Sequence, residues 1–511
     1  MYENGNKKPL EDVWRAWKGI KELELEDLNS FFNLAGYHGE PFVGAGAYSN
    51  KYWGGYCNHG NVLFPTWHRV YVLMVERALQ SVVPDVMLPY WDETSPESLS
   101  EGIPWALTKK QVELDGVMIQ NPLISFKFPV EVDDAANNLT SVFSYTKQKG
   151  YTTVRYPLSG LVGTEEARAE TKAHNAKYPN YEQNVAYLND NVTAWLNSGK
   201  TSPKAENAAQ ALPKVDSIHR KYLDCLNVPE YTAFSNTTSA AHWNKDKRRN
   251  VNVTALEDPH NDVHLSVGGF YKPGDPNNEF GEIAGANADM GENNTASFDP
   301  IFFFHHCNVD RMFWLWQQQN GRTDDFGIEE GDPGAKSTNP QQGPTPNFLA
   351  DSELSMDTPL TPFMISPLKD QRMYTSRDVI NIEKQMGVTY SKGSLEKEEA
   401  LPLTQMVASA KKSRKTLLVS GINRELFTGS FLVVAYAEID GEKRHVGTHS
   451  VLSRWSVKQC ANCLNHLEVE ASFSLEELSD EEIERATFSV DFVHRGGGHA
   501  HLVGYKLEVV E

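Results

Sequence analysis

The sequence predicts a mainly α protein in which a helical bundle is followed by a β-sandwich. Apolar residues recur at helical spacing in several segments of the first 320 residues. After residue 415, by contrast, five short segments alternate between apolar and polar residues, as strands with one buried face do. The length of 511 residues also exceeds what one hydrophobic core usually serves. We therefore assign residues 1–367 to a helical domain with its linker, and residues 368–511 to a β-sandwich domain.

The overall charge excludes two classes of partner. The chain has 48 Lys and Arg against 68 Asp and Glu, which gives a net charge of −20. This balance argues against nucleic acid or an anionic membrane as the main partner. No apolar run is long enough to span a bilayer. The N-terminal residues contain no signal-peptide core, so we expect a cytoplasmic or intracellular protein. No feature of the sequence points to a particular oligomeric state.

Helical periodicity begins near the N-terminus. Residues 12–34 predict two helices, and a loop rich in Gly and Tyr follows them to residue 55. A strongly amphipathic helix starts after Phe64 and carries a histidine near its beginning. Three histidines therefore occur in this first part of the chain: His38, His59 and His68. Further on, residues 205–226 predict another helix, to which no chemistry is assigned.

The most informative stretch runs from residue 258 to residue 316. His260 and His264 are four residues apart, so on a helix their imidazoles lie on one face. Asp299-Pro300 then predicts a helix start, and the aromatic residues that follow predict that this helix is buried. It carries the adjacent pair His305 and His306. A single His pair at helical spacing often faces solvent, but three imidazoles from two buried helices favour a metal site.

Two histidine triplets in one domain favour a dinuclear centre. Sites made only of imidazole suit copper, zinc, iron or nickel, and the order of divalent-ion affinities favours copper. Two metals that share one small ligand are typically about 3.5–4 Å apart. The Gly- and Asn-rich loop 268–294 separates the last two histidine motifs. Loops of that length are usually functional, and we expect Phe270 or Met290 near the metals.

The histidine motifs resemble those of the type 3 copper family, which comprises tyrosinases, catechol oxidases and molluscan-type haemocyanin units. Residues 56–69 (YCNHGNVLFPTWHR) resemble its CuA signature. Residues 258–264 (DPHNDVH) and 298–311 (FDPIFFFHHCNVDR) resemble its CuB signature. The resemblance covers roughly residues 10–320, and the C-terminal sandwich is similar to the shielding domain of fungal and some bacterial tyrosinases.

The resemblance implies two copper ions and a set of ligands. His38, His59 and His68 match the CuA ligands, and His260, His264 and His306 match the CuB ligands, with His305 as the fallback for His306. The implied partners are O2 and small phenolic substrates. The implied reactions are ortho-hydroxylation of monophenols and oxidation of catechols to o-quinones.

Cys57 matches a cysteine that forms a thioether with the second CuA histidine, here His59, in many members of the family. The alternative is a small buried thiol, which is the commoner state of a free cysteine. The other cysteines are Cys225, Cys307, Cys460 and Cys463. Five scattered cysteines do not form a disulfide framework.

Glu257 and Asn261 match the pair that orients a water molecule as a base in hydroxylating members of the family. Hydroxylation requires the phenol, with a pKa near 10, to lose its proton. A carboxylate and an amide that hold one water suit that task. The alternative for Glu257 is a negative charge that stabilises the N-terminus of a helix.

The resemblance also implies that the C-terminal domain places one apolar or aromatic side chain over the copper pair and keeps the enzyme latent. The candidates in this sequence are Val451, Leu452 and Trp455. Cys460 and Cys463 form a CxxC pair that suits Cu(I) during copper loading, because thiolates are soft ligands. A disulfide and two free thiols are the alternatives for that pair.

Three other functions share parts of this pattern. A catechol oxidase oxidises diphenols but does not hydroxylate monophenols. A haemocyanin-like carrier binds O2 reversibly at the same centre. A di-zinc or di-iron hydrolase needs two metals, but ligation by imidazole alone makes it the weakest of the three.

Overall fold

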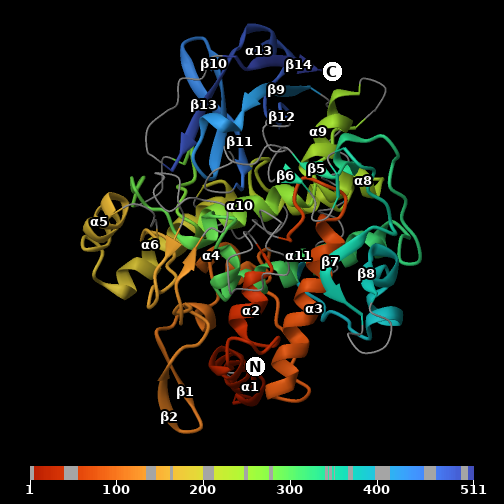
Figure 1. The fold of residues 1–511 in the computed structure, drawn as a ribbon. Helices are drawn as coiled ribbons and strands as arrows, with labels where there is room; N and C mark the ends of the chain where they lie inside the picture. The colour runs from red at the N-terminus through yellow and green to blue at the C-terminus, as the bar shows by residue number, and fades with distance from the viewer. Residues whose placement is uncertain are drawn as a thin grey trace.

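The computed structural model describes most of the chain. The described residues are 5–38, 56–133, 146–160, 165–199, 212–246, 251–275, 280–339, 343–344, 348–349, 351–365, 372–396, 405, 415–453, 468–495 and 504–510. Figure 1 shows a helical part that contains the N-terminus, and strands near the C-terminus that lie over helix α10. None of the helices in these ranges is long and apolar enough to cross a membrane.

The N-terminal helices occur where the sequence predicts them. Helices α1 (Lys8–Glu22) and α2 (Phe31–Gly36) fill the predicted pair, and α3 (Phe64–Val82) follows the loop. The Ser30 hydroxyl accepts a hydrogen bond from the Asn33 amide and so caps α2. Helix α3 begins at Phe64 because a proline in its first turn needs no hydrogen-bond acceptor there.

The middle of the helical domain contains further helices. They are α4 (Pro96–Glu101), α5 (Glu165–Asn175), α6 (Tyr181–Asn197), α7 (Ile218–Cys225), α8 (Tyr231–Ser235) and α9 (Thr237–Lys245). The helix predicted over residues 205–226 is therefore shorter among the described residues. Its start is fixed by Ser217, which accepts a hydrogen bond from the Arg220 amide, while Pro213 disfavours helix before it.

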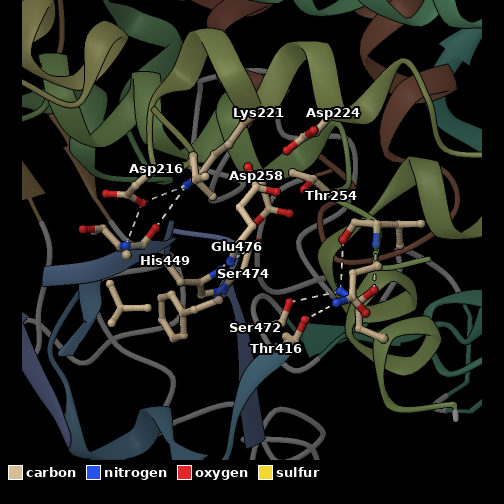
Figure 2. A pocket seen from close by; sticks show the side chains of 18 residues that line it. Asp216, Lys221, Asp224, Thr254, Asp258, Thr416, His449, Ser472, Ser474 and Glu476 are labelled. Carbon is tan, nitrogen blue, oxygen red and sulfur yellow. Dashed lines mark hydrogen bonds and ion pairs between the residues drawn. The ribbon is translucent and has the colours of Figure 1, made fainter. Parts of the chain in front are cut away.

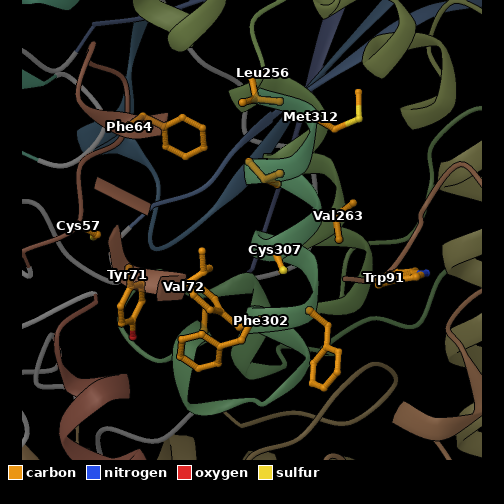
Figure 3. Close-up of a cluster of buried hydrophobic side chains, with 14 of the residues drawn as sticks. Cys57, Phe64, Tyr71, Val72, Trp91, Leu256, Val263, Phe302, Cys307 and Met312 are labelled. Atoms are coloured by element: carbon orange, nitrogen blue, oxygen red, sulfur yellow. The ribbon is translucent and has the colours of Figure 1, made fainter. Parts of the chain in front are cut away.

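Helices α10 (Glu257–Val267) and α11 (Ile301–Gln319) form the buried centre of the helical domain. Figure 3 shows side chains of α3, α10 and α11 meeting in one apolar cluster, among them Tyr71, Val263 and Phe302. The predicted burial of α11 is confirmed, because every residue from Ile301 to Gln317 except Leu315 is buried, and the ring centroids of Phe303 and Trp17 are 5.7 Å apart.

The connection between α10 and α11 folds back on the end of α10. It contains the short 3-10 helices η4 (Asp289–Gly291) and η5 (Ala296–Phe298). A Cβ atom on Gly268, at the end of α10, would lie 1.9 Å from the Gly291 nitrogen. Glycine is therefore needed at this close approach, which places η4 against the second histidine motif.

The segment after α11 stays on the helical core. It contains β7 (Pro359–Met364), β8 (Met373–Thr375), η7 (Ser376–Val379), η8 (Ile382–Met386) and η9 (Ser394–Glu396). Tyr374, Val379 and Leu395 belong to the helical hydrophobic cluster. The boundary predicted at residue 368 therefore precedes a segment of the helical core, and the first sandwich strand begins at Thr416. The sequence missed this because apolar periodicity does not show which core a short segment joins.

Among the described residues, two three-stranded antiparallel sheets form the C-terminal sandwich. One has the order β11-β10-β13 and the other β12-β9-β14. The strands are β9 (Thr416–Asn423), β10 (Phe431–Ile439), β11 (Glu442–Val451), β12 (Glu468–Ser474), β13 (Thr487–His494) and β14 (Lys506–Val510), with helix α13 (Asp480–Arg485) before β13. Alternate residues of facing strands, such as Val419, Val433 and Phe492, share one hydrophobic cluster. The five predicted strands are present.

Strand β11 is the one sandwich strand that the alternation did not predict. Its sequence is mostly polar, although its last five residues are buried. Part of this end lies against the helical domain, where the carbonyls of Thr448 and Ser450 accept hydrogen bonds from Lys221 and Asn261, whereas Val451 is buried in the sandwich core.

The remaining strands are short and pair locally. They are β1 (Gln111–Leu114) with β2 (Val117–Gln120), β3 (Val132–Asp133) with β4 (Thr146–Lys147), and β5 (Thr338–Asn339) with β6 (Gly343–Pro344).

Candidate dinuclear metal site

The three N-terminal histidines come together, although they lie in different segments. His38 follows α2, His59 precedes α3, and His68 lies in the second turn of α3. The ring centroids are 5.2 Å apart for His38 and His59, and 5.0 Å apart for His59 and His68. We call these residues the first trio.

The second trio consists of His260, His264 and His306. The Nε2 atom of His306 lies 3.2 Å from the Nε2 atom of His260 and 3.2 Å from that of His264. His260 and His264 face the same way from α10, as their four-residue spacing predicts, and α11 supplies the third ring.

The two trios touch each other. The ring centroids of His68 and His306 are 4.6 Å apart, and those of His59 and His260 are 5.4 Å apart. All six imidazoles are at most 1% exposed. Two contacting groups of three buried imidazoles match the ligand set of a dinuclear centre.

Hydrogen bonds fix which nitrogen of two rings faces the centre. Nδ1 of His68 is 2.8 Å from the Phe64 carbonyl, and Nδ1 of His264 is 2.9 Å from the Met290 carbonyl. A carbonyl only accepts hydrogen bonds, so both Nδ1 atoms carry the hydrogen. Both Nε2 atoms are therefore unprotonated and present a lone pair. The position of Met290 also agrees with the expectation that this loop residue lies near the metals.

These lone pairs fit a metal ion. Nε2 of His68 is buried and has no hydrogen-bond partner among the described residues. Burial lowers the pKa of His68 to about 3, and burial together with the neighbouring imidazoles lowers the pKa of His260 and His306 well below the usual range. Neutral imidazole is the form that binds metal. Nitrogen atoms that converge without a proton between them repel one another, whereas a cation among them removes that repulsion.

His305 is held differently from His306. Its Nδ1 atom donates a hydrogen bond to Oε1 of Glu93, at 2.6 Å. The other oxygen of Glu93 accepts a hydrogen bond from the Tyr222 hydroxyl, at 2.5 Å. A hydrogen bond at Nδ1 leaves Nε2 free in His305 as it does in His68 and His264, so both His306 and the fallback His305 offer a nitrogen to the second position. Sequence reasoning missed Glu93, because an acidic residue in a loop gives no sign that it will be buried.

Glu257 connects the two histidine motifs. Its Oε1 accepts a hydrogen bond from the amide of Gly60, at 2.7 Å, and its Oε2 accepts one from the amide of Thr237, at 3.0 Å. Gly60 follows His59 directly and has a φ of +63°, which favours glycine. Glu257 thus binds two other segments and is more than a charge at a helix N-terminus. Burial raises its pKa to about 7.

Asn261 makes two contacts at the centre. Its Oδ1 lies 2.9 Å from Nδ1 of His260, and its Nδ2 donates a hydrogen bond to the Ser450 carbonyl, at 3.3 Å. Ser450 lies on β11 of the sandwich. The amide of Asn261 therefore touches both a candidate ligand and the C-terminal domain.

Cys57 lies at the first trio. Its Sγ and one ring nitrogen each of His38 and His59 lie within 4.8 Å of one another. Nδ2 of Asn293 is 3.6 Å from the same sulfur. Cys57 is therefore buried beside His59, the histidine with which the thioether is predicted.

Of the three shielding candidates, the structure distinguishes two. Leu452 is buried in the hydrophobic cluster of the helical domain, whereas Val451 is buried in the cluster of the sandwich. Successive residues of an extended segment point to opposite sides, so only one of them faces the helical domain. The third candidate, Trp455, lies outside the described residues, as do Cys460 and Cys463.

A second contact joins the sandwich to the loop beside the second trio. Arg495, just after β13, forms a buried ion pair with Glu292, with 2.9 Å between Nη1 and Oε1. It also donates to the Ala288 carbonyl, at 3.0 Å. The amide of Asn293 donates to the Ser453 carbonyl, at 3.2 Å. Phe270, the other predicted neighbour of the metals, packs near Arg495, with 6.0 Å from its ring centroid to the guanidinium.

Charged side chains fill the seam between α7, α10 and β11. Figure 2 shows Asp216, Lys221 and Asp258 on the helical side of a cavity of about 80 Å³, with His449 of the sandwich opposite them. Lys221 donates to Asp262, at 2.6 Å, and to the Thr448 carbonyl, at 3.0 Å. Burial opposes its charge, but the surrounding carboxylates outweigh burial and raise the pKa of Lys221.

This seam is expected to weaken in acid. Burial lowers the pKa of His445 to about 4, against the effect of Asp216, while Lys272, Lys221 and Lys214 add to the lowering. An undocked His445 takes a proton below about pH 6.5, so its contribution to docking is lost as the pH falls from 6.5 to 4. Asp216 is buried, but the charges of Lys272 and Lys221 outweigh burial and hold the pKa of its carboxyl below the usual value, so its contribution is lost only at lower pH.

Limited proteolysis after brief incubation between pH 7 and pH 3.5 measures this release. We expect the sandwich to become cleavable at about pH 4, and the transition to move to lower pH in His445→Gln. A transition at the same pH in that variant would contradict the assignment to His445.

Comparisons with known proteins agree with the geometry. The family described as the common central domain of tyrosinase matches residues 28–319. The tyrosinase HcTyr2 of Hahella sp. (strain CCB-MM4) is 51% identical over 97% of this chain and 90% of its own length. A tyrosinase of Aspergillus oryzae is 40% identical over 94% of this chain and 89% of its own length. Among solved structures, the tyrosinase of Burkholderia thailandensis at low pH aligns with a TM-score of 0.87 and 49% identity, over 100% of this chain and 98% of that one.

Proposed function

The chain belongs to the tyrosinase family, and we propose that it hydroxylates monophenols at the ortho position and oxidises the resulting catechols to o-quinones with O2. The observation that carries the proposal is the contact between the two histidine trios, which are buried and face each other at 4.6 Å between the rings of His68 and His306.

The six histidines are the residues that hold two copper ions. His38, His59 and His68 would hold one ion, and His260, His264 and His306 the other. When bound, the copper pair supplies the two-electron chemistry that activates O2 and accepts electrons from a catechol. The protein fixes the rings through the carbonyls of Phe64 and Met290, so that the ligand nitrogens are oriented before the metal arrives.

Glu257 and Asn261 are proposed to deprotonate the phenol through a water molecule. The Glu257 carboxylate is fixed by backbone amides, and the Asn261 amide lies beside His260. A water between these two side chains would take the phenolic proton and be oriented by a carboxylate that is partly charged near neutral pH.

The sandwich is proposed to keep the enzyme latent, with Leu452 as the side chain that covers the site. Leu452 is buried among residues of the helical domain, and the next residue, Ser453, is bonded to the loop that supports His264. Docking of this strand also occupies the Nδ2 donor of Asn261 with the Ser450 carbonyl. The cover would therefore exclude substrate and engage a side chain that the hydroxylation needs.

Copper content and turnover before and after release of the sandwich test the proposal. We expect two copper ions per chain, little turnover in the intact protein, and turnover of both a monophenol and a catechol after limited proteolysis. Turnover of the catechol alone would identify a catechol oxidase. Reversible O2 binding without turnover of either substrate would identify an oxygen carrier.

A further inference from the structure

The second metal position is surrounded by four imidazoles, although three are expected to bind copper. One ring nitrogen each of His260, His264, His305 and His306 lies within 4.8 Å of the others. A metal centre that activates a small molecule keeps a coordination position open, whereas four protein ligands give a closed structural site. The fourth imidazole must therefore be kept away from the metal.

The ring of His305 packs against all three rings of the second trio. Its ring centroid is 5.3 Å from that of His260, nearly parallel to it, and 5.2 Å from those of His264 and His306. His305 and His306 are adjacent on α11, so their side chains leave the helix about 100° apart. Nε2 of His305 is buried and has no hydrogen-bond partner among the described residues, so it is the nitrogen available to a metal.

Glu93 fixes the direction in which this ring points. Its side chain is completely buried, and one oxygen accepts the Nδ1 hydrogen of His305 at 2.6 Å. The other oxygen accepts the hydroxyl hydrogen of Tyr222 at 2.5 Å, so the carboxylate is held at both ends. Tyr222 lies on α7 and His305 on α11, and Glu93 lies in the connection between α3 and α4. Two other segments thus fix the ring of His305.

We propose that Glu93 is a positioning residue that holds His305 out of the copper coordination sphere and thereby keeps the second copper site three-coordinate in protein ligands. The inference rests on the proposed dicopper function. Tyr222 supports Glu93 through the second hydrogen bond. Without Glu93, His305 becomes a fourth nitrogen ligand, which tightens copper binding and removes the position at which O2 binds.

Whether loss of Glu93 slows or speeds copper release distinguishes this role from a purely structural one. Removal of copper by a Cu(I) chelator is followed in wild type and in Glu93→Ala, together with thermal unfolding of both proteins without metal. We expect Glu93→Ala to release the second copper at least tenfold more slowly than wild type, while catechol oxidation after proteolysis falls. A structural role predicts the opposite, which is faster release together with lower stability.

Two further variants isolate His305. Glu93→Gln keeps an acceptor for Nδ1 of His305, so its copper release is expected to match wild type. The double variant Glu93→Ala with His305→Phe keeps an aromatic ring in the stack but removes the competing nitrogen, so its release rate is expected to return to the wild-type value. A crystal structure of copper-loaded Glu93→Ala should show a His305 nitrogen about 2.0–2.1 Å from the metal, the usual metal–imidazole distance.

Tyr222→Phe serves if Glu93→Ala does not fold. It removes one of the two hydrogen bonds of Glu93, and we expect a smaller slowing of copper release. Faster release in Glu93→Ala or in Tyr222→Phe, or no return in the double variant, would overturn the proposal. Wild-type protein that holds fewer than two copper ions would instead contradict the proposed function.

Discussion

Replacement of Arg495 by alanine is expected to raise catechol oxidation by the intact chain about 100-fold without proteolysis. Arg495 and Glu292 form an ion pair in which both side chains are at most 2% exposed. Removal of one partner of a buried pair costs about 3–5 kcal/mol, because the other charge stays buried. This loss destabilises only the state in which the sandwich is docked on the helical domain, because Glu292 is solvated when the sandwich is released. About 3 kcal/mol corresponds to a shift of roughly 100-fold towards the open state.

The measurement is the initial rate of catechol oxidation by copper-loaded protein. Arg485→Ala is the matched control, because Arg485 forms an exposed ion pair with Asp440 inside the sandwich, and exposed pairs contribute about 0–1 kcal/mol. We expect the control to remain latent. If Arg495→Ala is as latent as wild type while proteolysis activates both, Arg495 does not hold the cover.

The site could be predicted from sequence because its ligands obey local rules. His260 and His264 lie on one face because their spacing is close to a helical turn, and α11 is buried because three phenylalanines precede its histidine pair. Local spacing gives the direction of a side chain but not its partner. For this reason the hydrogen bond between His305 and Glu93, which is distant in sequence, could not be predicted.

The same limit applies to the interface between the domains. Alternation of apolar residues predicted the strands that build the sandwich core, but β11 is polar and was missed. Its end is buried against α10, where Thr448 and Ser450 bond to the helical domain. A strand buried by polar contacts has no periodic signal. The ligands could therefore be predicted from the sequence, whereas the interface residues that are proposed to control access to the site could not.

One loop connects the cover to both metal positions. The Met290 carbonyl accepts the Nδ1 hydrogen of His264, and Nδ2 of Asn293 contacts Sγ of Cys57. The same loop binds the sandwich through Glu292 and the Asn293 amide. Release of the sandwich thus acts on a loop that orients His264 in the second trio and contacts Cys57 beside the first trio.

Replacement of Glu257 by glutamine is expected to lower hydroxylation of a monophenol about 100-fold and to lower oxidation of a catechol by much less. A positioned general base typically contributes a factor of about 10²–10⁴, and the amide of glutamine does not act as a base. The measurement is the ratio of the two initial rates in protein whose sandwich has been released. Taking the ratio cancels differences in copper content between preparations.

Thr237→Val is the control for disturbed packing around Glu257. It removes the Thr237 hydroxyl, which donates to Oε2 at 3.2 Å, but leaves the backbone amide that donates at 3.0 Å. We expect this variant to lose some stability and to keep the wild-type ratio of rates. Equal losses on both substrates in Glu257→Gln would show that Glu257 supports the fold of the site and not the proton transfer.

The pH dependence provides a second check on Glu257. Burial raises its pKa to about 7, and the positive charge of bound copper favours the carboxylate and lowers that value. The base is therefore lost as the pH falls through 7 and below, so hydroxylation should decline there relative to catechol oxidation. In Glu257→Gln the ratio of rates should not vary with pH in this range. The proton that native Glu257 retains between pH 4.5 and 7 also means that its contribution to stability decreases as the pH rises through that window.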